Sequence, residues 1–455
     1  MHSARLSMVT LVFIFLFGTD TSTAQLVSGP MAGYVELRTA KIWVEVSPGS
    51  TAEIWYWKKG ADSRAQRLSI STDDSWWFAP VVFDLVALEM NTTYEYAVLV
   101  NNRSGKKPSK ADGEFTTQEL WQWRKPAPDF SFLTGSCAYF NEPVYDRPGP
   151  GYGKDSSIFD AMAKEKGSFM LWLGDNWYLR EADYLSQWGI WYRANHTRRL
   201  PILQNFLKSM AQYAIWDDHD FGPNDGDKSF VLKETSRKVF MNYWANPSYG
   251  EEGKGIYTRI TYNDCDFFLM DDRYFRSNDG MKPLVYGKPN ELKRMWGPVQ
   301  MEWLKNALLL SKASFKFIVT GSQTLNPVSP FDCLQDYPVE FEELMGFLSA
   351  EKINGVLFLT GDRHHSEVIR YDRREEYSLY DITSSPLTSS VGKVFGKEKD
   401  NPARVPNTLV EALNYSRISI SGKTGDRKLT VEFLGMRGEK LTEWSISEKE
   451  LKNKL

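Results

Sequence analysis

Residues 169–178 read FMLWLGDNWY, an apolar run that ends in a glycine and a carboxylate. The five residues from Phe169 to Leu173 predict a buried strand, which Gly174 breaks and Asp175 follows at once. Other apolar runs also end on polar side chains: FSFLTGSC on Cys137, YAIWDDHD on 217–220, FFLMDDR on 271–273, FKFIVTGSQ on 322–323 and GVLFLTGDRHH on 362–365.

Apolar runs that alternate with helical segments predict an α/β sheet buried on both faces, in which ligands gather at the carboxyl ends of the strands. A single Asp after a strand is often only a helix cap or a turn residue. Here Asp, His and Cys follow several strands. A multinuclear metal site is therefore the better interpretation.

The length of 455 residues suggests two or three domains. The formal net charge is -3 and the pI is close to 6.1. These values do not indicate the positively charged surface that binds nucleic acid or an anionic membrane. We therefore expect no nucleic acid as a specific partner.

The N-terminus has the layout of a secretory signal. Arg5 precedes an apolar run from Met8 to Phe17, and small residues at 22–24 stand before Gln25. The apolar run is shorter than a membrane-spanning helix needs, and no later stretch is long and apolar enough to span. We therefore expect residues 1–24 to be a signal peptide and the protein to be exported to the periplasm, the cell surface or the medium, with no transmembrane segment.

The chain has three cysteines, so they cannot all pair with one another. Cys137 stands at a strand end among candidate ligands. Cys265 lies in a strand-like run and Cys333 in an irregular loop, so we expect buried, unreactive thiols at these two positions.

Residues 25–118 show short alternating strands, namely KIWVEV (41–46), AEIWYW (52–57), PVVFDLVAL (80–88) and TTYEYAVLV (92–100). They predict an antiparallel sandwich that resembles a fibronectin type III domain. Its aromatic pair Trp76–Trp77 could bind carbohydrate, although we expect the two rings to pack within the sandwich. Two prolines mark residues 119–128 as a linker, and the catalytic domain is expected at 129–455.

Four helices are predicted in that domain, at about 155–166, 182–212, 298–310 and 340–351. The alternation of KLTVEFLGM at 428–436 predicts antiparallel strands near the C-terminus.

Carboxylates and imidazoles suit hard and borderline metal ions, whereas a thiolate and a phenolate favour a trivalent, iron-like centre. A site with two metals can bind a phosphate, polarise it and generate hydroxide for in-line attack. A histidine beside that site can bind the phosphate or protonate the leaving alkoxide.

At these residues the chain resembles the alkaline phosphatase D (PhoD-like) family of calcineurin-like metallophosphoesterases, relatives of the purple acid phosphatases. The shared motifs are GSC (135–137), LGDNWY (173–178), WDDHD (216–220), DDR (271–273) and TGDRHH (360–365). The resemblance runs from about Gly29 to the C-terminus. It implies an N-terminal all-β sandwich, like fibronectin III, followed by an α/β metallophosphatase domain of two sheets flanked by helices.

The resemblance also implies the metals and most of their ligands. It implies iron (ferric) and calcium, with zinc or manganese as alternatives. Asp175 would bridge two metals, and the full ligand set would be Cys137, Asp175, Tyr178, Asp218, Asp362 and His364. His219 would contact the phosphate and the leaving group. Arg273 is a candidate phosphate clamp, against a structural salt bridge to Asp271 or Asp272.

Gly321-Ser322-Gln323 stands where the superfamily has a Gly-His motif, so one usual histidine ligand is absent. The second metal should then be held more by oxygen atoms, which favours calcium over zinc. Gln323 and His365 are expected to support the ligands or to face the substrate.

These observations predict an exported metal-dependent phosphatase that hydrolyses phosphate monoesters, diesters or both by attack of a metal-bound hydroxide. The alternative is an exported glycan-binding protein whose metals are structural. An open metal site with a nearby histidine and arginine favours the enzyme.

Overall fold

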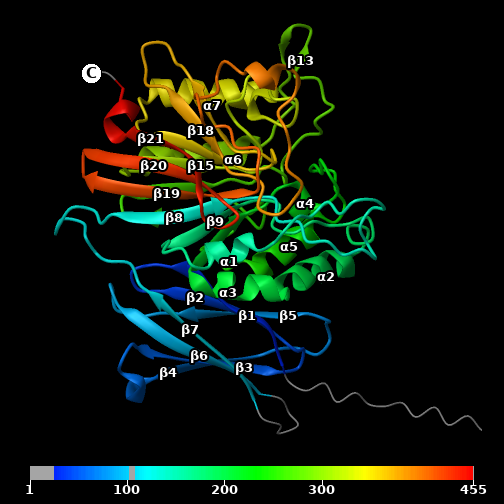
Figure 1. The fold of residues 1–455 in the computed structure, drawn as a ribbon, viewed down its shortest axis with the longest axis vertical. Coiled ribbons are helices and arrows are strands. Elements are labelled where there is room, and N and C mark those ends of the chain that lie inside the picture. The colour runs from blue at the N-terminus through cyan, green and yellow to red at the C-terminus, as the bar shows by residue number, and fades with distance from the viewer. Residues whose placement is uncertain (1–24, 102–107, 454–455) are drawn as a thin grey trace, which may run out of the picture.

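The structure is a computed structural model that describes residues 25–101 and 108–453. An N-terminal β-sandwich and a larger α/β domain are stacked along the long axis of the molecule (Figure 1). The expected signal peptide, 1–24, lies outside the described residues. Among the residues that are described, no helix is long and apolar enough to cross a membrane.

The sandwich consists of a three-stranded sheet, β1-β2-β5, and a four-stranded sheet, β4-β3-β6-β7, both antiparallel. In β3, Ala52, Ile54 and Tyr56 are buried while their neighbours are more exposed, as one packed face requires. The predicted all-β sandwich is confirmed. Its strands are β1 (Leu26–Val35), β2 (Ala40–Val46), β3 (Thr51–Lys58), β4 (Gln66–Ser71), β5 (Ala79–Leu85), β6 (Thr93–Asn101) and β7 (Ser109–Thr116).

The α/β domain contains two six-stranded sheets. The first has the order β10-β9-β8-β19-β20-β21, with β8 (Phe130–Gly135), β9 (Phe169–Leu173), β10 (Ala211–Ile215), β19 (Asn414–Lys423), β20 (Asp426–Gly435) and β21 (Lys440–Ser447). The second has the order β11-β12-β15-β16-β18-β17, with β11 (Thr258–Tyr262), β12 (Cys265–Leu269), β15 (Phe315–Val319), β16 (Val356–Thr360), β17 (Glu367–Tyr371) and β18 (Leu379–Thr383). A short hairpin pairs β13 (Leu284–Val285) with β14 (Lys288–Pro289).

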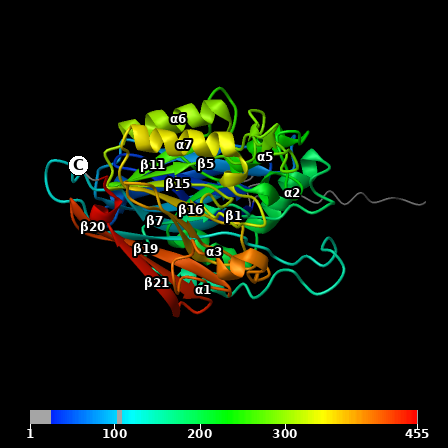
Figure 2. The ribbon, with the colours of Figure 1, turned by 90° about the horizontal axis from the view of Figure 1, so that it is seen from above.

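The apolar runs of the sequence divide between these sheets. β8, β9 and β10 are parallel neighbours in the first sheet, and β12, β15 and β16 are parallel neighbours in the second. The sheets pack face to face through an aromatic core, in which the Phe132 ring lies 5.1 Å from Phe267 and 5.8 Å from Phe317. The strands β9, β10, β12, β15 and β16 are buried at every position, so the expected burial on both faces is confirmed for them. The strands β19, β20 and β21 alternate buried and more exposed residues and lie at the outside of the molecule (Figure 2).

Helices cover the outer faces. α1 (Ile158–Met162), α2 (Gln187–Arg198), α3 (Pro201–Ser209) and α5 (Lys233–Tyr243) lie between the first sheet and the sandwich, while α6 (Gly297–Leu310) and α7 (Pro338–Ala350) cover the second sheet (Figure 1). The helix predicted at 182–212 is two helices, because Pro201 cannot continue α2 and instead begins α3. The shorter elements are α4 (Asp218–Phe221) and the 3₁₀ turns at Asp62–Arg64, Leu334–Asp336, Gly396–Asp400 and Glu448–Leu451.

The sandwich is joined closely to the helix layer. Tyr34 N donates a 2.8 Å hydrogen bond to Ala245 O, and Trp43 Nε1 donates a 2.7 Å bond to Asn242 O. A Cβ on Gly33 would lie 2.3 Å from the Ala245 Cβ, so this backbone approach requires glycine. The junction fixes the helices that flank the carboxyl ends of β9 and β10.

Candidate metal centre

The candidate ligands follow strands of both sheets and meet at one edge. Cys137 follows β8, Asp175 follows β9, Asp218 follows β10 and Asp362 follows β16. Backbone hydrogen bonds join these loops, since Ala138 N donates to Asp175 O at 2.9 Å and Gly361 N donates to Gly321 O at 2.8 Å. The parallel order of the strands therefore gathers side chains that lie far apart in the sequence.

Two glycines permit this close approach. Gly174 has φ +89°, and a Cβ there would lie 2.6 Å from the Asp217 Cβ. A Cβ on Gly361 would lie 2.6 Å from Leu173 O. Any side chain at either position would push the strand ends apart, which explains the glycine before Asp175 and the glycine before Asp362.

Asp175 is the centre of the first group of donors. Its Oδ2 accepts a 2.9 Å hydrogen bond from the Tyr178 hydroxyl and lies 3.6 Å from Cys137 Sγ. Burial raises the pKa of Asp175, and the charges of Asp218 and Asp220 raise it further. Burial likewise raises the pKa of Cys137 and of Tyr178, with Asp175 as the next cause in both.

Four of the candidate ligands have left-handed backbone, with φ of 62° at Cys137, 53° at Asp175, 65° at Asp362 and 56° at His364. Non-glycine residues adopt this region at a cost of about 1–3 kcal/mol each and keep it only where the surroundings enforce it. The fold therefore holds these side chains in an unusual direction, toward one another.

Asp218 and His219 form the second group. Asp218 Oδ1 accepts the His219 N–H and Oδ2 accepts the Asp225 N–H, both at 2.8 Å. Asp175, Asp218 and His219 offer ligand atoms that all lie within 4.8 Å of one another. Burial raises the pKa of Asp218, but His219 and Arg273 outweigh it and hold that pKa below its usual value.

Asp362 and His364 come from the turn between β16 and β17. Burial and the nearby Asp332 charge raise the pKa of Asp362 to about 7, whereas burial and His219 lower the pKa of His364 to about 4. The Tyr152 hydroxyl lies 3.4 Å from His364 Nδ1 and 3.5 Å from Nε2. His364 is thus kept neutral by its surroundings, as a metal-binding imidazole must be.

The donor set fits metal cations. A thiol, a phenol, carboxylates and imidazoles converge in a buried region, and mutual repulsion together with burial raises the pKa of Asp175 and Asp362. Bound cations would remove this penalty by stabilising the ionised carboxylates and thiolate. Cys137, Asp175 and Tyr178 would hold one cation, while Asp175, Asp218, Asp362 and His364 are available to others.

Arg273 is almost fully buried and lies beside this region. Its Nε donates to Asp217 Oδ1 at 2.6 Å, and its Nη2 lies 3.1 Å from Asp332 Oδ2. The salt bridge expected with Asp271 or Asp272 therefore forms with other partners. The contact between Arg273 and Asp271 is a hydrogen bond from the Arg273 backbone N–H to Asp271 Oδ1, at 3.1 Å. The guanidinium therefore neutralises the carboxylate next to Asp218.

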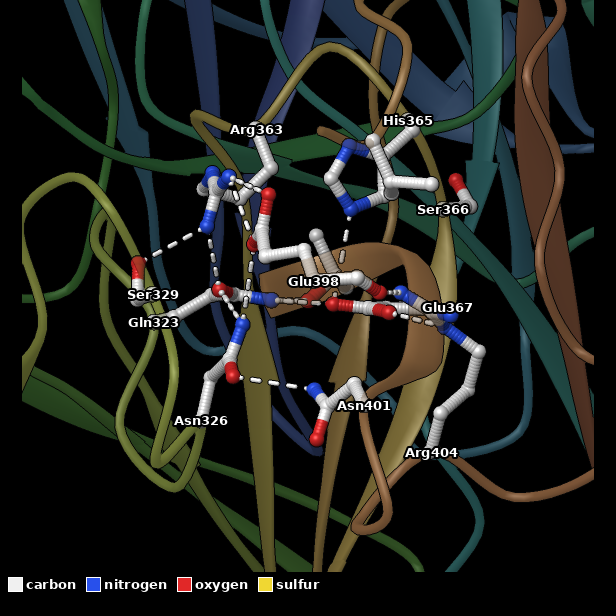
Figure 3. A network of polar contacts seen from close by, with 12 residues as sticks. Gln323, Asn326, Ser329, Arg363, His365, Ser366, Glu367, Glu398, Asn401 and Arg404 are labelled. Carbon is white, nitrogen blue, oxygen red and sulfur yellow. Dashed lines mark hydrogen bonds and ion pairs between the residues drawn. The ribbon is translucent and has the colours of Figure 1, made fainter. Parts of the chain in front are cut away.

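Gln323 and His365 lie in a buried polar network (Figure 3). Gln323 Nε2 donates to Glu367 Oε1 at 3.0 Å, and His365 Nε2 lies 3.4 Å from the same oxygen. Arg363 donates to Gln323 Oε1 at 2.8 Å and pairs with Glu398 Oε1, also at 2.8 Å. The network anchors Arg363 and His365, which alternate with Asp362 and His364 along the chain.

Sequence reasoning assigned no role to three residues that the structure brings into the site. Asp220 Oδ1 accepts the Asn176 N–H at 2.9 Å and Oδ2 accepts the Asp217 N–H at 3.0 Å, so it ties together the loops after β9 and β10. Ser385 Oγ donates to Cys137 Sγ at 3.2 Å. The run of acids at 217–220 was a signal for Asp220. The Pro/Gly-rich composition of 141–153, which is typical of loops that border active sites, was a signal for the segment that carries Tyr152, whereas Ser385 had none.

A cleft of about 690 Å³ opens beside the donors and is lined by Tyr178, His219 and the Pro/Gly-rich segment 141–152. Its volume is in the range of small-molecule sites. The cleft therefore gives a substrate access to the candidate metal ligands.

The chain is similar to known proteins in sequence. A family model described as PhoD-like phosphatase matches residues 132–430, and one described as a domain of unknown function (DUF7800) matches 23–118. Alkaline phosphatase D of Bacillus subtilis (strain 168) is 24% identical over 286 residues, which cover 52% of this chain and 46% of that protein. The chain thus spans about half the length of this curated relative.

Two solved structures share the fold. A structure of PhoD superposes with a TM-score of 0.75 at 17% identity and covers 95% of this chain and 92% of that chain. The purple acid phosphatase PPD1 from yellow lupin (Lupinus luteus) seeds has a TM-score of 0.62 at 11% identity, with 92% and 74% covered. At these identities the likeness shows the fold, and it confirms the expected sandwich and α/β metallophosphatase architecture.

Proposed function

Because this chain belongs to the PhoD-like phosphatase family, we propose that it is a metal-dependent phosphoric ester hydrolase that acts on phosphate monoesters, diesters or both. One observation carries the proposal: Cys137 and Tyr178 share Asp175 Oδ2, and Asp218 and His219 stand within reach of the same carboxylate. These donors border a cleft that can admit an ester.

Bound cations would supply Lewis acidity toward the phosphate and would lower the pKa of water. The chain's own residues have other tasks. We propose that His219 hydrogen-bonds the phosphate or protonates the leaving alkoxide through a ring nitrogen. Two observations support this role: His219 lines the cleft, and its ring packs 4.2 Å from that of Tyr178.

Arg273 is proposed to act on the phosphate indirectly. It sits between Asp217 and Asp332, so its charge limits the negative potential near Asp218. An anionic ester is repelled less by a site whose electrostatic potential is less negative. Asp220 is proposed to keep the loops after β9 and β10 in register through its hydrogen bonds to backbone N–H groups.

We propose iron and calcium as the cations, with zinc or manganese as the alternatives. The thiol of Cys137 and the phenol of Tyr178 suit ferric iron, whereas Asp218 and Asp362 offer oxygen donors that suit calcium. Gln323 does not replace the histidine that the superfamily has there, because its amide is engaged by Glu367, Thr383 and Arg363.

Export of the protein is also a proposal, which rests on the signal-like residues 1–24, as is the division into a sandwich at 25–118, a linker at 119–128 and a catalytic domain at 129–455. N-terminal sequencing of the protein from culture fractions checks the export. Cleavage before Gln25 is expected, and an intact Met1 in all fractions would contradict it.

The test of function is hydrolysis of a chromogenic phosphomonoester and a phosphodiester by purified protein, with and without a chelator. Turnover of at least one ester that is lost with chelator and restored by added metal is the expected result. If neither ester is hydrolysed while the metals remain bound, the proposal fails and the glycan-binding alternative gains support.

A further inference from the structure

The cleft is much larger than a phosphate group. Its volume of about 690 Å³ is comparable to pockets that enclose drug-sized ligands. Tyr178, His219 and the hydroxyl of Tyr152 mark the end of the cleft beside the candidate metal centre. The rest of the cleft must therefore face the alcohol part of an ester.

Charges on the cleft wall cancel in pairs. Arg147 Nη2 lies 2.7 Å from Glu181 Oε1, and Arg180 Nη2 lies 2.9 Å from Asp146 Oδ1. Arg180 also donates to Phe140 O at 2.7 Å, so its donors are engaged. A wall without surplus positive charge has little to offer a second phosphate or a carboxylate on the alcohol.

The apolar part of the wall consists of aromatic rings. Tyr152 lies edge-on to Tyr139 with centroids 4.8 Å apart and lies 6.3 Å from the Tyr178 ring. Tyr152 keeps 40% of its surface exposed, although its hydroxyl reaches His364. An exposed ring beside a reaction centre gives a planar or cyclic group a surface on which to pack.

Tyr152 is held in place by its neighbours. Asn141 Nδ2 donates to Gly153 O at 2.8 Å, and Gly153 N donates back to Asn141 Oδ1 at 3.0 Å. The next residue, Lys154, donates its N–H to Thr388 O at 2.6 Å. The teal segment that carries Tyr152 extends away from the sheets, yet it is tied at its base (Figure 2).

We propose that this cleft selects phosphate esters whose alcohol carries an uncharged ring, and that Tyr152 is the residue that determines this specificity. The ring of the alcohol packs against Tyr152 and Tyr139 while the phosphate faces His219. The inference rests on the proposed phosphoesterase function, to which it adds the class of substrate.

The experiment compares four esters on the metal-loaded protein: benzyl phosphate, ethyl phosphate, glucose 6-phosphate and 2-phosphoglycolate. Benzyl and ethyl alcohol are both poor leaving groups, so a difference between their esters reports binding of the ring. We expect kcat/KM for benzyl phosphate to exceed that for ethyl phosphate by about ten- to a hundredfold, as burial of a ring allows. 2-Phosphoglycolate, whose alcohol part carries a carboxylate, should have the lowest kcat/KM. Glucose 6-phosphate shows whether a sugar ring is accepted as well as a flat ring.

Variants assign the preference to Tyr152. Tyr152→Ala should lower the benzyl-to-ethyl ratio of kcat/KM at least fivefold, through KM, whereas Tyr152→Phe should keep the ratio because it keeps the ring. Tyr286→Ala is the matched control, since Tyr286 is fully exposed on the β13–β14 hairpin and does not line the cleft. That variant should behave like wild type.

Calorimetric titration with benzylphosphonate and ethylphosphonate measures the same preference without turnover. If no ester is hydrolysed but benzylphosphonate binds more tightly and Tyr152→Ala removes the difference, the proposed function fails and the cleft assignment stands. Equal kcat/KM for benzyl and ethyl phosphate, or an equal loss for both in Tyr152→Ala, would overturn the assignment while leaving the proposed function intact.

Discussion

Cys137 and Tyr178 both approach the same oxygen of Asp175, and in both the neutral form is favoured because burial raises the pKa. A thiol and a phenol so placed become good ligands only when a strongly acidic cation deprotonates them. These two residues distinguish the proposed site from one built of carboxylates and imidazoles alone.

Substitution of these residues should change the colour of the protein. Thiolate and phenolate ligands of ferric iron give charge-transfer absorption, so concentrated protein should be coloured. Tyr178→Phe should weaken or shift the visible band, and Cys137→Ser should reduce iron content and activity. Absorption spectra with metal analysis measure both effects.

Cys265→Ser is the control for these spectra, because Cys265 is also buried but lies at the start of β12, away from the proposed ligands at the carboxyl ends of the strands. Its iron content and spectrum should match wild type. A colourless, fully active protein that contains only zinc or calcium would refute the ferric assignment.

His219→Ala tests the proposed role in turnover. His219 donates its backbone N–H to Asp218, and this bond does not need the ring, so the loop can persist in the variant. We expect turnover to fall roughly 10²- to 10⁴-fold while metal content stays near that of wild type. Loss of the metals in this variant would show that His219 is a principal ligand instead.

At the scale of elements, the turn between β16 and β17 alternates its side chains. Arg363 and His365 turn toward Glu398 and Glu367 (Figure 3). Asp362 interacts instead with the charge of Asp218, and His364 lies beside the Tyr152 hydroxyl. Glu398 lies in a 3₁₀ turn more than thirty residues further along the chain. The ligand-bearing turn is therefore braced by a distant segment.

Glu398→Gln should loosen this brace. Both partners of the Arg363–Glu398 pair are buried, so removing one charge leaves the other buried without compensation. We expect a loss of stability on the order of 3 kcal/mol and a metal affinity that is about tenfold lower. Urea unfolding and competitive metal titration measure the two effects.

The matched control for this pair is Glu443→Gln, which removes the partner of Lys440 on the exposed face of β21. Solvent screens that pair, so stability and metal affinity should not change. If Glu398→Gln is as stable as wild type and binds metal equally well, the network does not brace the turn.

At the scale of the whole molecule, the sandwich contributes a buried carboxylate to the junction. Glu45, on β2, accepts a 2.8 Å hydrogen bond from the Tyr243 hydroxyl at the end of α5. Burial raises the pKa of Glu45 from 4.5 to about 7. Between these pH values the folded protein binds more protons than the unfolded chain, so its stability falls as pH rises.

Glu45→Gln should remove this dependence, because the amide has no charge to bury and can still accept from Tyr243. At pH 8 the variant should be more stable than wild type by roughly 1–3 kcal/mol, and at pH 5 the difference should be small. Thermal unfolding at the two pH values measures it. Glu114→Gln, on a side chain 57% exposed, is the control, and an identical pH profile for Glu45→Gln and wild type would contradict the assignment.

The sequence predicted the elements well where local patterns determine them. The six apolar runs form the strands β8, β9, β10, β12, β15 and β16. The helix predicted at 298–310 is α6, Gly297–Leu310. The helix predicted at 155–166 is only Ile158–Met162, because the next residues form i→i−3 turns: Lys164 N donates to Ala161 O and Glu165 N donates to Met162 O. Periodicity did not reveal that the apolar runs divide between two sheets, since a strand buried by helices and one buried by a second sheet have the same pattern.

The sequence by itself determined which chemical groups are present and that they follow strands: Cys137, Asp175, Tyr178, His219 and Asp362 were all named from motifs. Only the tertiary structure decided which of these groups meet and what supports them. The partners of Arg273 are Asp217 and Asp332, and the hydroxyl of Tyr152 reaches His364. The composition of the loop that carries Tyr152 indicated a place beside the site but not which residue would make this contact. The physical reason is range: strand and turn preferences act over a few neighbouring residues, whereas ion pairs and the walls of a cleft depend on how distant segments pack.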